Sequence, residues 1–205
     1  MHKTSERPWL KNYQKNVPYE INPDKYPNLL ALMEESFAKY SNSYAHKCLG
    51  KILTFREWDV FSKKIAVYLN SLNLSKGEKV AVMLPNLLQN PISIVGILRA
   101  GLVVVNVNPL YSERELAHQL KDSDAKAIII LENFSKSFNN IVQKTNVKHV
   151  ITTNVGDLLG FKGLLINFTL RYLKKIIPKI KYNKSITTLY TFKQINKNID
   201  SDKYI

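Results

Sequence analysis

Apolar residues return along this chain at two different spacings, and these spacings predict its elements. Residues 28–40 repeat apolar side chains every three or four positions, which is the period of an amphipathic helix. Residues 44–54 form two short extended runs around Gly50, which predicts a hairpin whose tight turn favours glycine. A T-x-x-E capping box at residues 54–57 then predicts a helix over residues 55–73. The beginning of the chain is therefore expected to fold as helix, hairpin and helix.

Strands and helices alternate from residue 79 onwards. Largely apolar runs predict buried strands over residues 79–85, 102–107 and 125–131, and KHVITT predicts a fourth strand over residues 148–153. Amphipathic patterns predict helices over residues 87–100, 112–121 and 134–145. Gly101 suits a helix end, and S-x-x-E at residues 112–115 is a second capping box. Because parallel strands need crossover helices and bury both sides, we predict an α/β fold with a mostly parallel, doubly wound sheet and helices on both faces.

The pattern divides the chain into three parts. Residues 1–25 mix charged and polar groups and are expected to form an N-terminal arm, and residues 26–155 hold the α/β part. Residues 156–205 are expected to hold a basic amphipathic helix and a truncated continuation. The N-terminus lacks the continuous apolar region of a secretory leader, and no stretch reaches the roughly 18 uninterrupted apolar residues of a membrane span. We therefore expect neither export nor a transmembrane segment.

The net charge of +14 is concentrated in one stretch of the chain. Between Asn133 and Ile199 there are twelve Lys or Arg and one acid, Asp157, so this stretch supplies +11 of the total. A solvated basic face is the ordinary outcome of such a bias, and without a recognition motif a nucleic-acid partner is not favoured. The single cysteine, Cys48, excludes disulfides and multi-thiolate metal sites and indicates a reducing, cytoplasmic compartment.

Candidate chemistry is sparse. Ligands of such sheets bind at the carboxyl ends of strands, but the loops there are not glycine-rich. Neither a G-x-x-x-x-G-K-[ST] phosphate loop nor a G-x-S-x-G motif occurs in the sequence. The four histidines lie far apart, and His46 with Cys48 is more typical of packing than of ligation. The charged residues 113–115 suit the first turn of a helix better than an acid/base pair. We therefore predict no catalytic residues and no metal ligands in this chain.

Residues 161–184 have the pattern of a basic amphipathic helix, with seven Lys or Arg and no acid. At about 100° per residue, one face collects Phe161, Leu165, Phe168, Tyr172 and Ile176. The opposite face collects Asn167, Arg171 and Lys174. Together with Lys162 and Lys175, these side chains suit a helix that lies in an anionic membrane surface. A helix that packs its apolar stripe on the protein core has the same pattern, so both interpretations stay open.

Several stretches resemble one enzyme family. LTFREW (53–58) and LRAGLVVVNVNPLY (98–111) resemble the first two core motifs of the AMP-forming adenylation superfamily. VPYEINPDKYPNLLALMEESFAKY, MLPNLLQNP and NPLYSERELAHQLKDS are similar to the N-terminal part of bacterial long-chain fatty acid–CoA ligases of the FadD type. The resemblance covers nearly the whole chain and weakens after about Val155. It implies that the fold is an incomplete N-terminal portion of the large domain of an adenylate-forming ligase.

For function, the resemblance implies a part of an enzyme that joins a long-chain fatty acid to CoA through an acyl-adenylate, with ATP and Mg²⁺. The phosphate loop of that family comes shortly after the region that ends here at Ile205, so we expect no cofactor to bind this chain alone. The resemblance also implies that the loop of Pro109, Leu110 and Tyr111 lies near the approach of CoA. A tyrosine at such a place packs on sheets as readily as it binds ligands.

The implied partners are a long-chain fatty acid, CoA and a complementary C-terminal chain, and an anionic membrane surface is a further candidate. The chain is expected in the cytoplasm, either free or peripherally on the inner face of the cytoplasmic membrane. The alternative interpretation is a non-catalytic membrane-surface or lipid-binding module built on the same scaffold.

Overall fold

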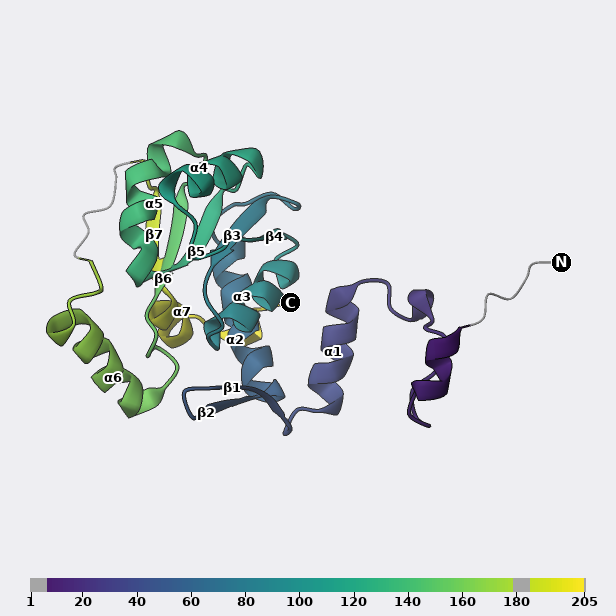
Figure 1. Ribbon diagram of the computed structural model, residues 1–205. Coiled ribbons are helices and arrows are strands. Elements are labelled where there is room, and N and C mark those ends of the chain that lie inside the picture. The colour runs from purple at the N-terminus through teal and green to yellow at the C-terminus, as the bar shows by residue number, and fades with distance from the viewer. Residues whose placement is uncertain (1–6, 179–184, 205) are drawn as a thin grey trace.

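A computed structural model describes residues 7–178 and 185–204, and its centre is a parallel sheet of five strands (Figure 1). The strands are β3 (Lys79–Met83), β4 (Val103–Asn106), β5 (Ala127–Leu131), β6 (His149–Thr153) and β7 (Thr188–Thr191). Four of them lie where the sequence predicts strands, whereas β7 is not predicted. The α/β fold with a parallel sheet is therefore confirmed.

The strand order is β4-β3-β5-β6-β7, and every neighbouring pair is parallel. Val80 of β3 is in register with Val104 of β4 on one side and with Ala127 of β5 on the other. The chain thus leaves β3 in one direction to form β4, crosses back to β5, and then continues outwards. The reversal lies between β3 and β5, which makes this edge of the sheet a topological switch point.

Helices cover both faces of the sheet (Figure 1). One face is covered by α2 (Phe55–Asn70), α3 (Gln89–Arg99) and α7 (Phe192–Asn198), and the other by α4 (Glu113–Asp122) and α5 (Ser135–Ile141). Alternate residues of one strand serve the two cores. In β3, Val80 and Val82 pack towards the first set of helices, and Ala81 and Met83 pack towards the second. The sheet is therefore buried on both sides, as its apolar strands require.

Helix starts follow local capping chemistry. Thr54 and Ser112 each accept a hydrogen bond from the backbone amide three residues later, and Glu57 and Glu115 bond back to the cap amide. Both predicted capping boxes are confirmed. A third, formed by Thr191 and Gln194, starts α7. The predicted helix over residues 134–145 is shorter than expected, because turns of 3-10 helix flank α5 on both sides.

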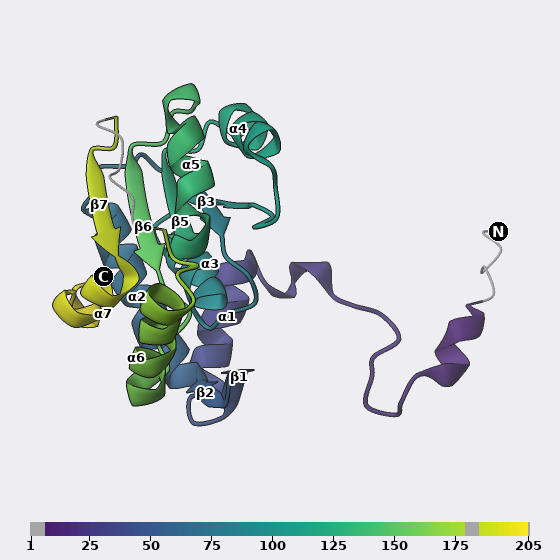
Figure 2. The ribbon, with the colours of Figure 1, turned by 60° about the vertical axis from the view of Figure 1, so that its left-hand side comes forward.

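The N-terminal part lies beside the sheet domain. It contains α1 (Leu29–Lys39) and an antiparallel hairpin of β1 (Tyr44–Cys48) and β2 (Lys51–Thr54). The hairpin turn places Leu49 and Gly50 at φ 50° and 85°, the left-handed region that glycine tolerates best. Short 3-10 turns at Pro8–Asn12 and Pro23–Lys25 lie in an arm that extends away from the rest of the molecule in Figure 1 and in Figure 2.

After β6 the chain forms α6 (Gly160–Phe168), continues as a π-helical turn at Thr169–Leu173, and then returns to the sheet as β7 and α7. The helix predicted over residues 161–184 thus ends at Leu173, and residues 179–184 lie outside the described part of the chain. Figure 2 shows α6 beneath the arrowhead of β6, at the carboxyl edge of the sheet.

Candidate functional site

The carboxyl edge of the sheet is the candidate site, because ligands of doubly wound sheets bind outside the strand ends where the strand order reverses. Three loops meet this edge near the switch point. Residues 84–88 follow β3, residues 107–112 follow β4 and residues 132–134 follow β5. α6 lies at the same edge, because its side chains bond to residues that follow β5 and β6.

The loop after β4 holds an exposed apolar side chain in a defined turn. Asn108 Oδ1 accepts a hydrogen bond from the Leu110 amide at 3.0 Å, and Asn108 O accepts one from the Tyr111 amide at 3.1 Å. Leu110 is 85% exposed, whereas Tyr111 is half-buried against the core beneath α4 and α5. Just beyond, hydrogen bonds from Ser112 lower the pKa of the Glu115 carboxyl. Of the predicted loop residues, Leu110 is thus the most open to a ligand and Tyr111 packs on the fold.

A network of hydrogen-bonded polar side chains lies at the carboxyl ends of β3 and β6. Gln89 Nε2, in a residue that is 1% exposed, donates to Thr153 Oγ1 at 3.2 Å and to Asn154 O at 2.9 Å. The Asp157 carboxylate accepts from Thr153 Oγ1 at 3.0 Å, from the Asn154 amide at 2.8 Å and from Asn167 Nδ2 at 3.1 Å. Asp157 is a functional candidate that was not predicted, although a single acid in a strongly basic stretch is a sign that it has partners.

One stripe of α6 and the following turn faces the protein. Gly163, Asn167 and Arg171 are four residues apart and therefore share a side of the helix. A Cβ atom on Gly163 would lie 1.9 Å from Gly156 O, so only glycine allows this contact. Asn167 Oδ1 accepts from the Gly156 amide at 2.8 Å, and Arg171 forms an ion pair with Glu132. Polar groups and backbone, rather than an apolar stripe, hold this helix on the molecule.

The opposite stripe of α6 is apolar and faces solvent. The predicted apolar residues are all more than half exposed, from 51% for Ile176 to 76% for Phe161. The exposed set is Phe161, Leu164, Leu165, Phe168, Tyr172, Leu173 and Ile176, of which Leu164 and Leu173 were not predicted. The interpretation of a core-facing apolar stripe is therefore wrong for these residues. We call this set the α6 apolar face.

The predicted basic side of this helix differs from the expectation. Arg171 bonds to Glu132, and Lys162 Nζ donates to Leu49 O at 3.1 Å, so both side chains contact the protein. Lys174 and Lys175 are exposed. Two of the predicted basic side chains thus face the protein, because Glu132 and the Leu49 carbonyl accept their hydrogen bonds. No helix in the described part of the chain is long and apolar enough to cross a membrane.

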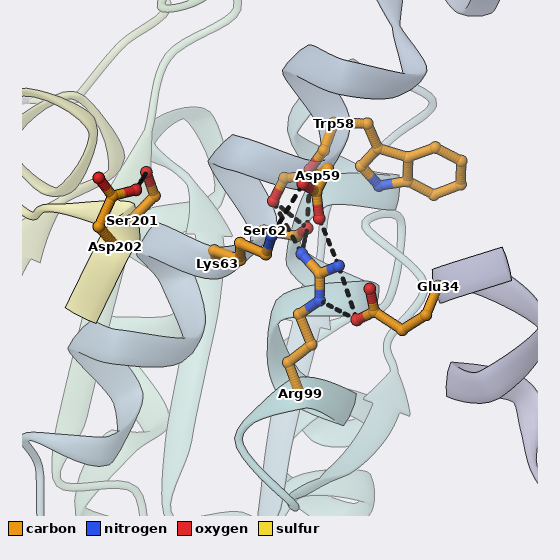
Figure 3. Close-up of polar contacts among 8 residues, drawn as sticks. All are labelled: Glu34, Trp58, Asp59, Ser62, Lys63, Arg99, Ser201 and Asp202. Atoms are coloured by element: carbon orange, nitrogen blue, oxygen red, sulfur yellow. Dashed lines mark hydrogen bonds and ion pairs between the residues drawn. The ribbon is translucent and has the colours of Figure 1, made fainter. Parts of the chain in front are cut away.

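The most completely bonded polar cluster lies away from the carboxyl edge, where α3 ends (Figure 3). Arg99 Nε donates to Glu34 Oε1 at 2.9 Å, and its two terminal nitrogens reach the Asp59 carboxylate, the Asp59 carbonyl, Ser62 Oγ and Glu34 at 2.6–2.7 Å. All five N–H groups thus have acceptors. This cluster was not predicted, although Arg99 is the only charged residue in the predicted helix 87–100. Its position at the amino edge indicates a structural role.

The hairpin carries the remaining candidate groups. The His46 ring packs against Trp58 with centroids 4.5 Å apart, and burial lowers the pKa of His46. Cys48 Sγ lies 3.7 Å from Asn86 O. Within residues 7–178 and 185–204, no group of three or more His, Cys, Asp or Glu side chains is placed to hold a metal ion.

Comparison with known proteins relates this geometry to a family. Residues 33–191 match the family described as AMP-binding enzyme. The chain is 50% identical over 173 residues to the long-chain-fatty-acid–CoA ligase of Escherichia coli O157:H7, and 44% identical over 184 residues to that of Haemophilus influenzae. These alignments cover 83% and 89% of this chain but only 31% and 33% of the relatives. The chain spans about a third of the length of the curated relatives it matches.

Solved structures agree on the fold. The crystal structure of the anthranilate CoA ligase AuaEII in complex with anthranoyl-AMP matches 86% of this chain and 28% of its own, with a TM-score of 0.65 and 16% identity. At that identity the likeness supports the architecture alone. The family match covers most of the chain, and the strands, the capping boxes at Thr54 and Ser112 and the switch-point loops lie within it. This chain belongs to the family of AMP-binding enzymes.

Proposed function

We propose that this chain is the scaffold part of a long-chain fatty acid–CoA ligase. The observation that carries the proposal is the 50% identity over 173 residues to the ligase of Escherichia coli O157:H7, combined with a shared adenylate-forming fold. The reaction of such a ligase couples ATP cleavage to formation of an acyl-adenylate and then of an acyl-CoA. In this assignment the chain contributes the sheet, the carboxyl-edge loops and α6.

The residues of this chain do not fit the requirements for binding ATP. Binding of a triphosphate needs consecutive backbone amides brought close by small residues, a lysine and a metal-binding side chain. The sequence contains no G-x-x-x-x-G-K-[ST] loop, and the three loops at the switch point are not glycine-rich. We therefore assign no catalytic residue here, and place adenylate formation on the two thirds of the ligase that these 205 residues do not cover.

Reconstitution tests this proposal. The chain is co-expressed with a polypeptide corresponding to the remainder of the Escherichia coli relative, and pyrophosphate release is measured with ATP, Mg²⁺, CoA and a long-chain fatty acid. We expect turnover from the pair and none from either chain alone. Robust turnover by this chain alone, or an inactive pair that forms a stable complex, contradicts the proposal.

A membrane surface is proposed as a second partner, because the α6 apolar face is open to solvent. A membrane-surface helix needs an apolar side that enters the headgroup boundary and nearby cations for anionic lipids. Phe161 and Phe168 lie on the open side, and the exposed Lys174 and Lys175 follow it. The contact would serve an enzyme whose fatty acid substrate partitions into lipid, so it belongs to the same ligase rather than to a separate non-catalytic module.

Vesicle sedimentation tests the membrane contact. We expect binding to vesicles that contain anionic lipid, and a loss of binding in the double variant Phe161→Ser, Phe168→Ser. Leu110→Ser is the control, because it removes an apolar side chain that is more exposed than either phenylalanine and lies in a different loop. Equal binding to neutral and anionic vesicles would remove the electrostatic part of this proposal. No binding to either would remove the whole of it.

The loop at Pro109, Leu110 and Tyr111 is proposed to lie beside CoA in the complete enzyme. Its support is the exposure of Leu110 at the carboxyl edge of the sheet. In the reconstituted enzyme, Leu110→Glu is expected to raise the KM for CoA and to leave the KM for ATP unchanged, because a new carboxylate repels an anionic cofactor. An unchanged KM for CoA would remove this assignment.

A further inference from the structure

Two hollows adjoin where the chain passes from β6 into α6. The larger has a volume of about 420 Å³, and the smaller about 240 Å³. Asp157, Gly160 and Lys193 line both of them, so they form one depression, which we call the α6 groove. Its combined size falls in the range of small-molecule sites, which is about 300–1,000 Å³.

The α6 groove has an apolar wall, and its other lining residues are glycines and the polar Lys51, Glu57, Asp157, Asn167, Lys193 and Asn196. The larger hollow is lined by Leu53, Phe61, Leu88, Leu158 and Leu159. The smaller one is lined by Leu164, which is also part of the exposed α6 apolar face. Apolar side chains therefore extend from the exposed Leu164 of α6 to the buried Leu53 and Leu88. A flexible hydrocarbon chain fits such a wall, because its burial needs apolar contact area and no directional bonds.

The charges at the groove leave one cation unpaired. Lys51 Nζ is 3.1 Å from Glu57 Oε1, and the Asp157 carboxylate already accepts three hydrogen bonds. In the described part of the chain, the exposed Lys193 has neither a hydrogen bond nor an ion pair of its side chain. It lies where the two hollows meet. An ammonium group at the mouth of an apolar groove favours an anionic head group.

A second polar side chain stands beside Lys193 on the same side of α7. Asn196 is three residues further along the helix and lines the larger hollow. Both polar atoms of its carboxamide are buried, and neither has a hydrogen-bond partner among the residues that the structure describes. Buried polar groups are normally paired, so a ligand head group that reached this side chain would supply what it lacks.

We infer that the α6 groove binds a single acyl chain that carries an anionic head group, with the head at Lys193 and the chain along the leucine wall. The inference rests on the proposed function, since a ligase of long-chain fatty acids meets such molecules. It concerns a holding site at α6 and not the place of the reaction. The ligand chemistry is shared by a free fatty acid and by an anionic lipid in a membrane.

Fluorescence titration of the purified chain tests the groove. The probe is cis-parinaric acid, a long-chain fatty acid whose fluorescence rises when it leaves water, used below the concentration at which it forms micelles. Lys193→Glu is expected to weaken binding about tenfold or more, because it replaces a charge-assisted hydrogen bond by repulsion. Lys197→Glu is the matched control, because Lys197 is exposed on the same helix but does not line the groove.

A neutral analogue makes the test independent of folding. The methyl ester of the same fatty acid is expected to bind the unchanged chain more weakly than the acid does, and Lys193→Glu should lose or reverse this preference for the acid. Equal binding of acid and ester to the unchanged chain overturns the inference. An equal loss in Lys193→Glu and Lys197→Glu overturns it as well, because the effect would then be net charge.

Vesicle sedimentation distinguishes the two sources of the ligand, a free fatty acid and a membrane lipid. If the groove takes a free fatty acid, Lys193→Glu weakens binding of cis-parinaric acid and leaves vesicle sedimentation unchanged; if it takes a membrane lipid, both fall. Failure of the ligase proposal would appear in the reconstitution assay, whereas failure of this inference appears only in the titration. The two can therefore be told apart.

Discussion

Two arginines attach helices to this molecule in different ways. The side chain of Arg99 is 0% exposed, and all five of its N–H groups point to acceptors on α1 and α2. The rings of Phe37 and Tyr204 pack against its guanidinium group. The side chain of Arg171 is 35% exposed and reaches one carboxylate, Glu132. The first arrangement closes a seam between helices, and the second holds one side of a helix while the other side stays open.

The difference separates stability from function. A buried guanidinium that lost its acceptors would stay desolvated and unpaired, so the Arg99 cluster constrains how α1, α2 and α3 pack. The Arg171 pair is accessible to water and salt, so it contributes little free energy but fixes which face of α6 points outward. Groups available to a partner are therefore found at α6 and at the carboxyl-edge loops rather than at Arg99.

The largest expected effect comes from removing the buried arginine. Arg99→Ala should lower the free energy of unfolding by about 3–5 kcal/mol, because it leaves the partly buried carboxylates of Glu34 and Asp59 without their shared partner. The stability of Arg99→Lys should lie between that of the unchanged chain and that of Arg99→Ala, since an ammonium group cannot replace the five N–H donors of a guanidinium. Urea unfolding measures this, with the exposed Arg114→Ala as a control. A loss below about 1 kcal/mol for Arg99→Ala would contradict the structural role.

A smaller effect is expected where α6 touches the turn after β6. In Gly163→Ala, the new methyl group would overlap Gly156 O, so α6 must shift. We expect the free energy of unfolding to fall by about 1–3 kcal/mol, the usual cost of overpacking. Leu164→Ala in the same helix serves as control, because its side chain is exposed and should change stability by less than about 0.5 kcal/mol. Equal stability of the two variants would show that the contact is not tight.

The exposed ion pair should matter less and should depend on salt. Arg171→Met is expected to lower the free energy of unfolding by less than about 1 kcal/mol at low salt, and by still less at high salt. The loss in Arg99→Ala should persist at high salt, because the buried cluster is poorly screened. A salt-independent loss in Arg171→Met that matches the loss in Arg99→Ala would erase the distinction between the two regions.

The smallest expected effect is a pH dependence of the free energy of unfolding that comes from His46. Its ring packs on Trp58 of α2, the helix that also holds Asp59 and Ser62 of the Arg99 cluster. Burial lowers the pKa of His46 below its ordinary value of about 6.5, so the unfolded chain binds the proton more readily than the folded one. The contribution to stability is therefore complete above pH 6.5 and is lost as the pH falls below it. Unfolding at pH 7.5 and 5.5 should show this loss, and His46→Phe should reduce it. An unchanged pH dependence in the variant would assign the loss to other groups, such as His149, whose pKa burial also lowers.

Much of the fold could be predicted from local pattern. Strands that are buried on both faces read as continuous apolar runs, as β5 does with its five buried residues. The capping boxes at Thr54 and Ser112 are local as well, and both are formed. In contrast, β7 has the sequence TLYT with no fully buried residue, so its pairing with β6 depends on tertiary contact that no local pattern reveals.

The candidate site was less predictable. Helical periodicity shows that Phe168 and Arg171 lie on different sides of α6, but not which side meets the protein. The side that meets the protein is determined by Glu132 and Asp157, whose carboxylates lie at the carboxyl edge and bind Arg171 and Asn167. The role of Arg99 was hidden in the same way, because its acceptors come from residues 65 and 40 positions away in the chain.

We propose that this chain is the scaffold of a fatty acid–CoA ligase and does not bind ATP by itself. Calorimetric titration of the purified chain with ATP and Mg²⁺ tests it most directly. We expect no heat beyond that of dilution for this chain alone. We expect ATP to bind when the rest of the ligase is also present. Tight binding of ATP by this chain alone would contradict the account.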